Sequence, residues 1–218
     1  QQDFAISSHY KANLARESNM FDNEIVSITN NDEKINKDGG IRPNTSHEIL
    51  DGLKLAFDEN GTVTAGTASP LTDGASAVIV CEEEYAKKNN PNILARIKST
   101  AVVGCPPELM GLGPIYASKK ALKRANLSIS DIDIVELNEA FASQSLACIK
   151  ELKMDINKVN IHGGAIALGH PLGATGARIT GKVATLLQNN NKKYGLATQC
   201  IGFCLLYTSP SPRDVWVS

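Results

Sequence analysis

The sequence predicts an α/β protein in which helices and strands form layers. Between residues 94 and 200, short apolar runs that favour strands alternate with longer segments whose apolar residues recur at helical spacing. Turn signals such as Asp73-Gly74 separate segments of this kind. A third observation is a loop of five glycines within residues 163–178 that leads into a helical pattern. Strands that alternate with helices are typical of layered α/β folds, because the helices pack on the faces of the sheet.

The first part of the chain is predicted to hold two helices and three short strands. Apolar residues at helical spacing mark the helices, and Ile49, Leu53 and Phe57 outline the second one. A polar stretch between the helices is typical of a surface loop. The expected elements are a helix over residues 1–20, a strand over 24–28, a loop over 30–40, a helix over 45–57, a strand over 62–65, a turn over 66–71 and a buried strand over 75–80.

The second part is predicted to repeat a strand–helix unit. Ala117, Ala121 and Leu122 are expected to face inward from one helix. Ile179 and Val183 begin the apolar face of another. The expected elements are a strand over residues 94–103, a helix over 114–125, a strand over 132–137, a helix over 139–152, a short strand over 159–161, a helix after 175 and a strand over 194–200.

Composition excludes several classes of function. The 218 residues carry 22 basic and 23 acidic side chains, a formal net charge of −1, so neither nucleic acid nor a membrane surface is expected as a partner. The apolar runs are far shorter than a membrane span, and no signal peptide is recognisable. The five cysteines and four histidines show no metal-ligand spacing, so reduced thiols and no metal site are expected. These features predict an intracellular protein, with mitochondrion, peroxisome and cytoplasm not distinguished.

His170 lies in the middle of the glycine-rich stretch 163–178. Ala, Ile, Leu and Pro fill the gaps between the glycines, which indicates a packed turn rather than a flexible linker. The loop alone leaves three interpretations: a phosphate-cradling turn, a core histidine with satisfied hydrogen bonds, or a general base held by a rigid turn. No Gly-x-Gly-x-x-Gly or Gly-Lys-Ser/Thr pattern supports the first of them.

Asn138 and Cys200 each stand at the end of a predicted strand. Ligands of α/β sheets bind beyond the carboxyl ends of strands, so Asn138, His170 and Cys200 are expected to converge if their strands are parallel neighbours. An imidazole beside a thiol favours the thiolate, and an asparagine can stabilise an oxyanion directly or through a water. The alternatives are a buried core thiol at Cys200 and an ordinary helix N-cap at Asn138.

Three stretches resemble the C-terminal active-site motifs of the thiolases, which are the acetyl-CoA acetyltransferases and 3-ketoacyl-CoA thiolases. They are Asn138-Glu-Ala-Phe141, the glycine-rich stretch 163–178 and Cys200-Ile-Gly202. Residues 61–69, 73–74 and 110–114 resemble further family stretches in the same order. The resemblance covers residues 1 to about 202. It implies the layered αβαβα fold of the thiolases, here expected to be incomplete, with part of the N-terminal half and the last strand missing.

The resemblance implies reversible acyl transfer between 3-ketoacyl-CoA and acetyl-CoA, by thiolysis in one direction and Claisen condensation in the other. In the family one cysteine becomes acylated, while a second cysteine and a histidine move protons. Cys200 matches the second cysteine, and His170 matches the histidine. Asn138 matches the asparagine that holds an oxyanion-hole water, and Gly202 matches the glycine whose N–H serves the acyl-enzyme oxyanion.

Four residues match family positions near coenzyme A: Arg42, Ser69, Met110 and Phe141. Coenzyme A and acyl-CoA are therefore implied as substrates, and no permanently bound cofactor is expected. A homodimer or homotetramer is expected for the full-length protein.

The resemblance also divides the chain. Residues 1–92 look like the C-terminal part of the thiolase N-terminal domain, with a loop segment that covers the coenzyme over 1–71 and a return to the N-terminal half over 72–92. Residues 93–203 look like the thiolase C-terminal domain. Residues 204–218 contain two Ser-Pro pairs, which do not suit the family's final strand, and resemble adapter or vector sequence.

The acylated cysteine of the family lies upstream of Gln1, where a helical pattern is already under way. The chain is therefore interpreted as a fragment that is inactive on its own. Two other functions remain open. A ketoacyl synthase acting on carrier-protein substrates would need a second catalytic histidine where Asn138 stands. A non-catalytic lipid- or protein-binding protein is opposed by the intact set of Asn138, His170 and Cys200.

Overall fold

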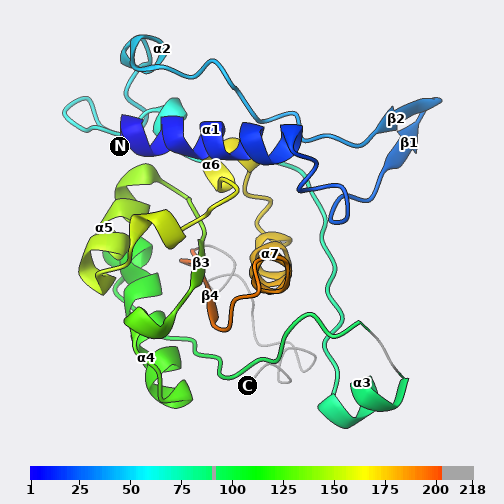
Figure 1. The fold of residues 1–218 in the computed structure, drawn as a ribbon. Helices are drawn as coiled ribbons and strands as arrows, with labels where there is room; N and C mark the ends of the chain where they lie inside the picture. The colour runs from blue at the N-terminus through cyan, green and yellow to red at the C-terminus, as the bar shows by residue number, and fades with distance from the viewer. Residues whose placement is uncertain (90–91, 203–218) are drawn as a thin grey trace, which may run out of the picture.

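The centre of the computed structural model, which describes residues 1–89 and 92–202, is a pair of parallel strands. The strands are β3 (Ile134–Leu137) and β4 (Gly195–Thr198), and their four residues pair in order from first to last. Both strands therefore end at the same edge. All four β3 side chains are buried, as expected for a strand covered on both faces. Helices lie on either side of the pair, which gives the layered α/β architecture (Figure 1).

Two helices cover one face of the strand pair and a third covers the other. α4 (Gly113–Ala125) and α5 (Ala142–Leu152) pack on the first face, and α7 (Thr175–Asn189) packs on the second through Ile134 and Leu186. The main apolar core lies between β3, α4 and α5; its buried members are Ile115, Leu122, Ile132, Val135, Leu137, Cys148, Ile149, Leu152, Met154, Val159 and Leu196.

A long helix, α1 (Gln2–Glu17), crosses above the edge at which β3 ends, with the short helix α6 (Ala165–Leu168) beneath it (Figure 1). Small side chains such as Ala5 and Ala12 form the buried face of α1. An added Cβ on Gly163 would lie 2.6 Å from the Cβ of Ala12. Small residues on both sides thus let α1 approach the glycine-rich loop closely.

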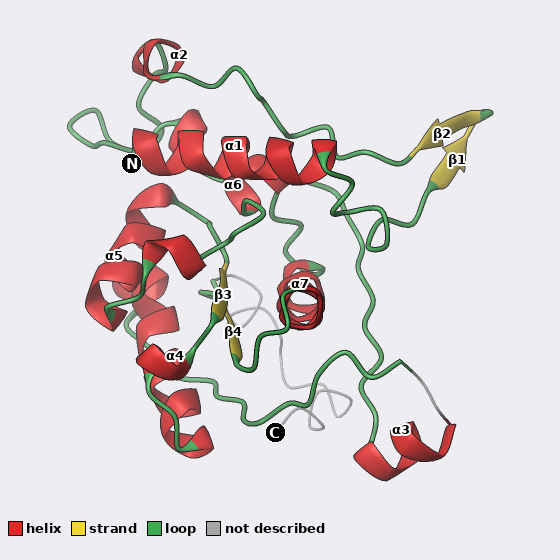
Figure 2. Ribbon diagram, viewed as in Figure 1, coloured by secondary structure: helices red, strands yellow, loops and turns green. Residues whose placement is uncertain are grey.

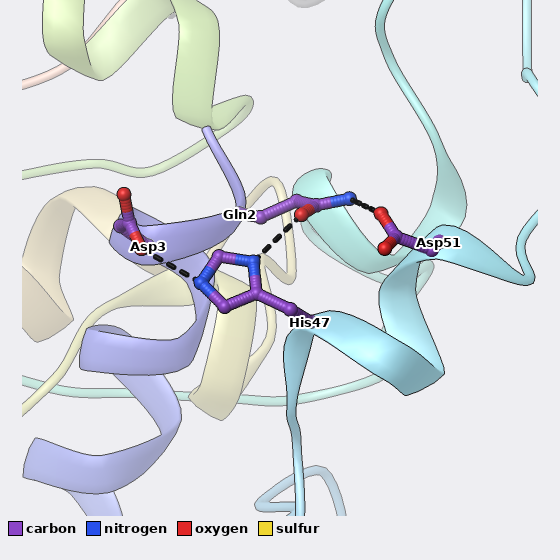
Figure 3. A network of polar contacts seen from close by, with 4 residues as sticks. All are labelled: Gln2, Asp3, His47 and Asp51. Atoms are coloured by element: carbon purple, nitrogen blue, oxygen red, sulfur yellow. Dashed lines mark hydrogen bonds and ion pairs between the residues drawn. The ribbon is translucent and has the colours of Figure 1, made fainter.

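A polar network on the surface links α1 to α2 (His47–Asp51), as Figure 3 shows. The Nδ1 atom of His47 lies 2.8 Å from Oε1 of Gln2, and its Nε2 atom lies 2.9 Å from Oδ1 of Asp3. The side-chain amide of Gln2 also donates to Oδ1 of Asp51 at 2.8 Å. These contacts are exposed, so they orient α2 without belonging to the core.

A hairpin and a short helix lie away from the strand pair (Figure 2). β1 (Ile28–Asn30) and β2 (Glu33–Ile35) form an exposed antiparallel hairpin. α3 (Glu83–Asn89) follows an extended stretch of chain. Short 3₁₀ segments occupy residues 65–67, 107–112, 129–131 and 156–158.

The three helices and two of the four strands predicted for the second half are confirmed. The predicted strands over 132–137 and 194–200 correspond to β3 and β4, and the predicted helices correspond to α4, α5 and α7. The helix predicted over 1–20 is α1.

Two predicted strands, over residues 75–80 and 94–103, are wrong. Both segments are extended but pair with no strand within the described ranges 1–89 and 92–202. Their apolar side chains are exposed, Ile79 at 96% and Val102 at 69%. A strand needs a neighbour that accepts and donates its backbone hydrogen bonds, and no described segment supplies one here.

Smaller corrections concern element lengths. The strand predicted over 24–28 begins only at Ile28, where the hairpin starts, and the helix predicted over 45–57 ends at Asp51, before Gly52. The strands predicted over 62–65 and 159–161 each reduce to a single bridge, Leu55 with Thr64 and Val135 with Val159. Residues 203–218, which include the predicted non-family tail, lie outside the described residues.

Candidate active site

Asn138 directly follows β3 and is fully buried. Its backbone N–H donates to the carbonyl oxygen of Thr198 at 3.0 Å, which continues the β3–β4 pairing by one residue. Because side chains alternate along a strand, Asn138 shares a face with Glu136 and Ile134, the face that α7 covers. The strand pair therefore fixes the backbone from which this amide projects.

The glycine-rich loop carries His170 to the same place. Gly169 adopts φ +93°, a conformation that L side chains rarely adopt, and a Cβ there would lie 2.5 Å from Oγ1 of Thr72. Nε2 of His170 lies 3.3 Å from Nδ2 of Asn138. On the other side of the ring, Nδ1 lies 2.7 Å from Oγ1 of Thr175. Both ring nitrogens thus have a polar partner.

Glu139 is fully buried, and its side chain forms hydrogen bonds with three neighbouring segments. Its carboxylate accepts hydrogen bonds from Oγ of Ser8 on α1 at 2.6 Å, from Nδ2 of Asn160 at 2.7 Å and from the backbone N–H of Ile166 on α6 at 3.1 Å. Gly164 leaves room for it, because a Cβ there would lie 2.2 Å from the carboxylate carbon. Burial raises the pKa of Glu139, while these hydrogen bonds lower it.

Cys200 lies two residues beyond β4 and is 7% exposed. Burial raises the pKa of its thiol to about 11, with smaller contributions from Cys148 and Cys105. Gly202 lies beside Met110, since a Cβ on Gly202 would be 3.6 Å from Cε of Met110. The end of β4 therefore holds a protonated, buried thiol and a contact between two of the predicted site residues.

The predicted triad is assembled in part. Asn138 and His170 meet, and Cys200 stands at the end of the neighbouring strand. Burial, followed by the charge of Arg178, lowers the pKa of His170, so imidazole and thiol are both neutral at pH 7. Among the residues that the structure describes, no hydrogen bond joins Cys200 to His170. The expected activation of the Cys200 thiolate by the imidazole is therefore not present in this arrangement.

Two of the residues expected near coenzyme A lie next to each other. The backbone N–H and Oγ of Ser69 both donate to the carbonyl oxygen of Ala140, at 3.0 and 3.2 Å. Ala68 forms an antiparallel bridge with Phe141, whose ring meets that of Phe57 edge to face at 5.8 Å. The segment around Ser69 is thereby attached to the chain just after Asn138.

Arg42 is placed differently. Its side chain is exposed, and its backbone N–H donates to Nδ1 of His9 on α1 at 3.1 Å. No hydrogen bond or ion pair of the Arg42 side chain is present among the described residues. The structure thus gathers Ser69 with Phe141, and Met110 with Gly202, but does not join Arg42 to either pair.

The N-cap alternative for Asn138 is wrong, because the N-cap of α5 is Phe141. Sequence reasoning missed Glu139 and Thr175 as residues that support the site. The available signals were a carboxylate directly after a buried strand and a hydroxyl five residues after His170.

Two family models match most of the chain. The model described as the thiolase C-terminal domain matches residues 91–205, and the model described as the thiolase N-terminal domain matches residues 1–84. The chain belongs to the thiolase family. The resemblance inferred from the motifs is confirmed.

Curated relatives are similar over most of the chain. It is 52% identical over 211 residues to a 3-ketoacyl-CoA thiolase of Shewanella loihica, covering 93% of the chain and 54% of that relative. A 3-ketoacyl-CoA thiolase of Photobacterium profundum is 51% identical over 212 residues, with coverages of 93% and 54%. The chain thus spans about half the length of the curated relatives it matches.

Solved thiolase structures have the same fold. The structure of human mitochondrial 3-ketoacyl-CoA thiolase in complex with CoA matches with a TM-score of 0.90 and 44% identity, over 92% of this chain and 51% of that one. The acetyl-CoA acetyltransferase of Bacillus anthracis matches with a TM-score of 0.88 and 42% identity, over 92% and 52%. The predicted α/β thiolase fold is confirmed.

In the described part of the chain, no helix is long and apolar enough to span a membrane.

Proposed function

We propose that this chain supplies the proton-transferring half of a thiolase. Such an enzyme transfers the acyl group of 3-ketoacyl-CoA to coenzyme A and releases acetyl-CoA by thiolysis, and it runs the reverse reaction as a Claisen condensation. The observation that carries the proposal is the contact between Asn138 and His170 at the end of β3, beside the strand that leads to Cys200. The names of the relatives, 3-ketoacyl-CoA thiolase and acetyl-CoA acetyltransferase, support the same activity.

In thiolysis, a cysteine outside the present sequence attacks the 3-keto carbon, and the bond between C2 and C3 breaks. The departing acetyl-CoA enolate needs a proton at C2. Cys200 is suited to donate it, because burial keeps its thiol protonated with a pKa of about 11. The thiol of coenzyme A then gives its proton back to Cys200 and takes the acyl group from the enzyme.

His170 and Asn138 act on the developing charges. A neutral imidazole has one nitrogen without a hydrogen, which can take the proton of the attacking cysteine. Asn138 would hold a water in the oxyanion hole, and its buried Oδ1 atom has no partner among the described residues. Gly202 would supply a backbone N–H to the oxyanion of the acyl-enzyme.

Coenzyme A and acyl-CoA are substrates in this proposal, and no permanent cofactor takes part. Ser69, Met110, Phe141 and Arg42 are proposed to lie along the coenzyme. The human 3-ketoacyl-CoA thiolase structure in complex with CoA supports this choice of ligand. Arg42 has an exposed side chain, as a residue that meets a phosphate at the surface would.

We also propose the domain division inferred from the sequence. Residues 1–71 form the segment over the coenzyme, residues 72–92 return to the N-terminal domain, and residues 93–203 form the C-terminal domain. The two family matches, over 1–84 and 91–205, support a boundary near residue 90. The proposed assembly is a homodimer or homotetramer of the full-length protein.

The test joins this chain to the part of the Shewanella loihica enzyme that precedes the matched segment. The fused protein should consume 3-ketoacyl-CoA in the presence of coenzyme A. Replacing the thiol by Cys200→Ser should slow turnover by about 10²–10⁴-fold, the usual contribution of general acid–base catalysis. Cys81→Ser, which changes an exposed thiol, serves as the matched control and should have no effect. Full activity of the Cys200→Ser protein would remove Cys200 from the mechanism.

The chain of 218 residues should show no turnover by itself, because no cysteine in it matches the acyl carrier of the family. Thiolysis of acetoacetyl-CoA by the purified chain measures this directly. Turnover that disappears on His170→Ala would show that a cysteine within the chain carries the acyl group.

A further inference from the structure

The imidazole of His170 is held at both nitrogens. Nδ1 lies 2.7 Å from Oγ1 of Thr175, and Nε2 lies 3.3 Å from Nδ2 of Asn138. Thr175 and Asn138 are both fully buried, whereas the ring of His170 between them is partly exposed. Only Asn138 was expected at the site from the sequence.

The protons of this network can be assigned. A threonine hydroxyl has one hydrogen to donate, and Oγ1 of Thr175 donates it to the carbonyl oxygen of Pro171 at 3.1 Å. The same oxygen must then accept at its lone pair, so Nδ1 of His170 is the donor. Nε2 is left without a hydrogen and accepts from the amide of Asn138. The amide thus turns its NH₂ to the ring, and its Oδ1 remains without a partner among the described residues.

The position of Thr175 is fixed by the backbone. It is the first residue of α7, and the backbone N–H groups of Ala174 and Thr175 donate to Pro171 O at 2.9 and 3.0 Å. His170 directly precedes Pro171. Ring and hydroxyl therefore belong to one tight turn, whose geometry does not depend on a distant contact.

The tautomer matters because the ring is neutral. A doubly protonated imidazole has no tautomers, whereas a neutral ring carries its hydrogen on either nitrogen. Burial lowers the pKa of the His170 imidazole below 6.5, and the positive charge of Arg178, one turn further along α7, lowers it too. At physiological pH a choice between Nδ1–H and Nε2–H must therefore be made.

We propose that Thr175 is a positioning residue that holds His170 in the Nδ1–H tautomer and so leaves Nε2 unprotonated, with its lone pair toward the Asn138 amide until a proton is taken. The catalytic consequence rests on the function proposed above; the tautomer does not. The opposite arrangement would have Thr175 donating to Nδ1 and His170 donating from Nε2 to a turned Asn138 amide. That arrangement gives up the hydrogen bond to Pro171.

The experiment uses the 218-residue chain with ¹⁵N-labelled histidine. Nitrogen NMR at pH 8 distinguishes a protonated from an unprotonated ring nitrogen, and His170→Gln identifies the His170 signals by their loss. We expect Nδ1 of His170 to be protonated and Nε2 unprotonated. An Nε2–H ring in the unmutated chain would overturn the proposal, and this measurement requires no variant of Thr175.

Two variants of Thr175 then separate the effect of its hydroxyl group from the effect of its side-chain shape. Thr175→Ser keeps the hydroxyl and should keep the Nδ1–H tautomer. Thr175→Val keeps the shape, removes the acceptor, and should produce a mixture of tautomers. Identical spectra in the Ser and Val proteins would overturn the proposal.

The fused enzyme adds a kinetic measurement. There Thr175→Val should lower kcat by up to about 10-fold, the rate change that corresponds to the loss of one net hydrogen bond, with little change in KM. Thr175→Ser should restore kcat. A Val protein with unchanged kcat would show that the tautomer is not used in catalysis, and an inactive fused parent would count against the proposed function while the NMR result stands.

Discussion

Residues 107–202 and residues 72–106 have similar apolar content but very different structures. The first region contains the parallel strands, three covering helices and the main core. In its described residues, 72–89 and 92–106, the second runs as extended chain with one short helix, α3, and few buried side chains. Ile134 in the first is 3% exposed, whereas Ile79 in the second is 96% exposed.

The difference lies in partners rather than in propensity. The apolar run that becomes β3 has β4 beside it and helices on both faces. The run over 75–80 is attached through single contacts, such as Oγ of Ser76 donating to the carbonyl oxygen of Ala174 at 2.6 Å. A strand sequence thus becomes a strand only where another strand completes its hydrogen bonds. We expect the segments over 75–80 and 94–103 to pair with strands from the part of the thiolase fold that this chain does not span.

The largest expected effect is in hydrogen exchange. β3 and β4 pair with each other and every β3 residue is buried, while residues 74–80 make no backbone–backbone hydrogen bonds within the described residues. Opening free energies range from near zero to the global value, so the two sets should differ by several orders of magnitude in protection. Exchange followed by mass spectrometry measures both in one sample.

The same exchange measurement can contradict the proposed difference between the two regions. Strong protection of 74–80 in the isolated chain would show that this segment pairs with something, for example a second copy. In the fused enzyme we expect the protection of 74–80 to approach that of β3.

The second prediction compares two core-type substitutions. Leu137→Ala should lower the free energy of unfolding by about 2–5 kcal/mol, because Leu137 is 1% exposed and its loss leaves a cavity. Ile79→Ala should change it by less than about 0.5 kcal/mol, since Ile79 already contacts water. Urea unfolding of the two proteins gives the difference. Equal effects would mean that residues 75–80 are buried in solution.

The third prediction concerns the pH dependence of stability, which a buried carboxyl in the first region should produce. Glu136 is fully buried on β3, and burial raises the pKa of its carboxyl from 4.5 to about 8, although Arg178 and Lys182 lower it. The folded state therefore keeps a proton that the unfolded state releases above pH 4.5. The stability contributed by Glu136 is fully present below pH 4.5 and is lost as the pH rises to about 8.

Glu136→Gln removes this dependence. Relative to the unmutated chain, the variant should gain stability between pH 5 and 8, by at most about 1.4 kcal/mol per pH unit. Urea unfolding at several pH values measures the gain, and Glu151→Gln on the exposed face of α5 is the matched control. A difference that stays constant with pH would show that Glu136 is ionised in the folded protein.

Much of the second half could be predicted from sequence because its signals are local. The apolar period marks α4 and α7, and the position of Asn138 after a buried run places it at a strand end. The strands over 75–80 and 94–103 could not be judged in this way, since a strand depends on a distant partner. The spacing of apolar residues identifies a possible strand but does not show which other strand it pairs with.

The site was predictable to the same degree. His170 and Asn138 follow from a glycine-rich loop and a strand end, and the structure brings them within 3.3 Å. The supports are tertiary: Glu139 bonds Ser8, which is 131 residues away in sequence. The neutral state of Cys200 is likewise set by burial, which no local pattern reveals.

The smallest expected effect tests whether visible polar contacts can replace burial. His47 lies 2.8 Å from Gln2 and 2.9 Å from Asp3, yet the side chains of His47 and Asp3 are 56% and 91% exposed. Exposed pairs of this kind contribute about 0–1 kcal/mol, because water competes for the same groups and salt screens the charge. His47→Ala should therefore lower the free energy of unfolding by less than about 1 kcal/mol, well below Leu137→Ala. Urea unfolding at low and high salt measures this change in the free energy of unfolding. A loss as large as that of Leu137→Ala would show that these exposed contacts, and not burial, hold α2 against α1.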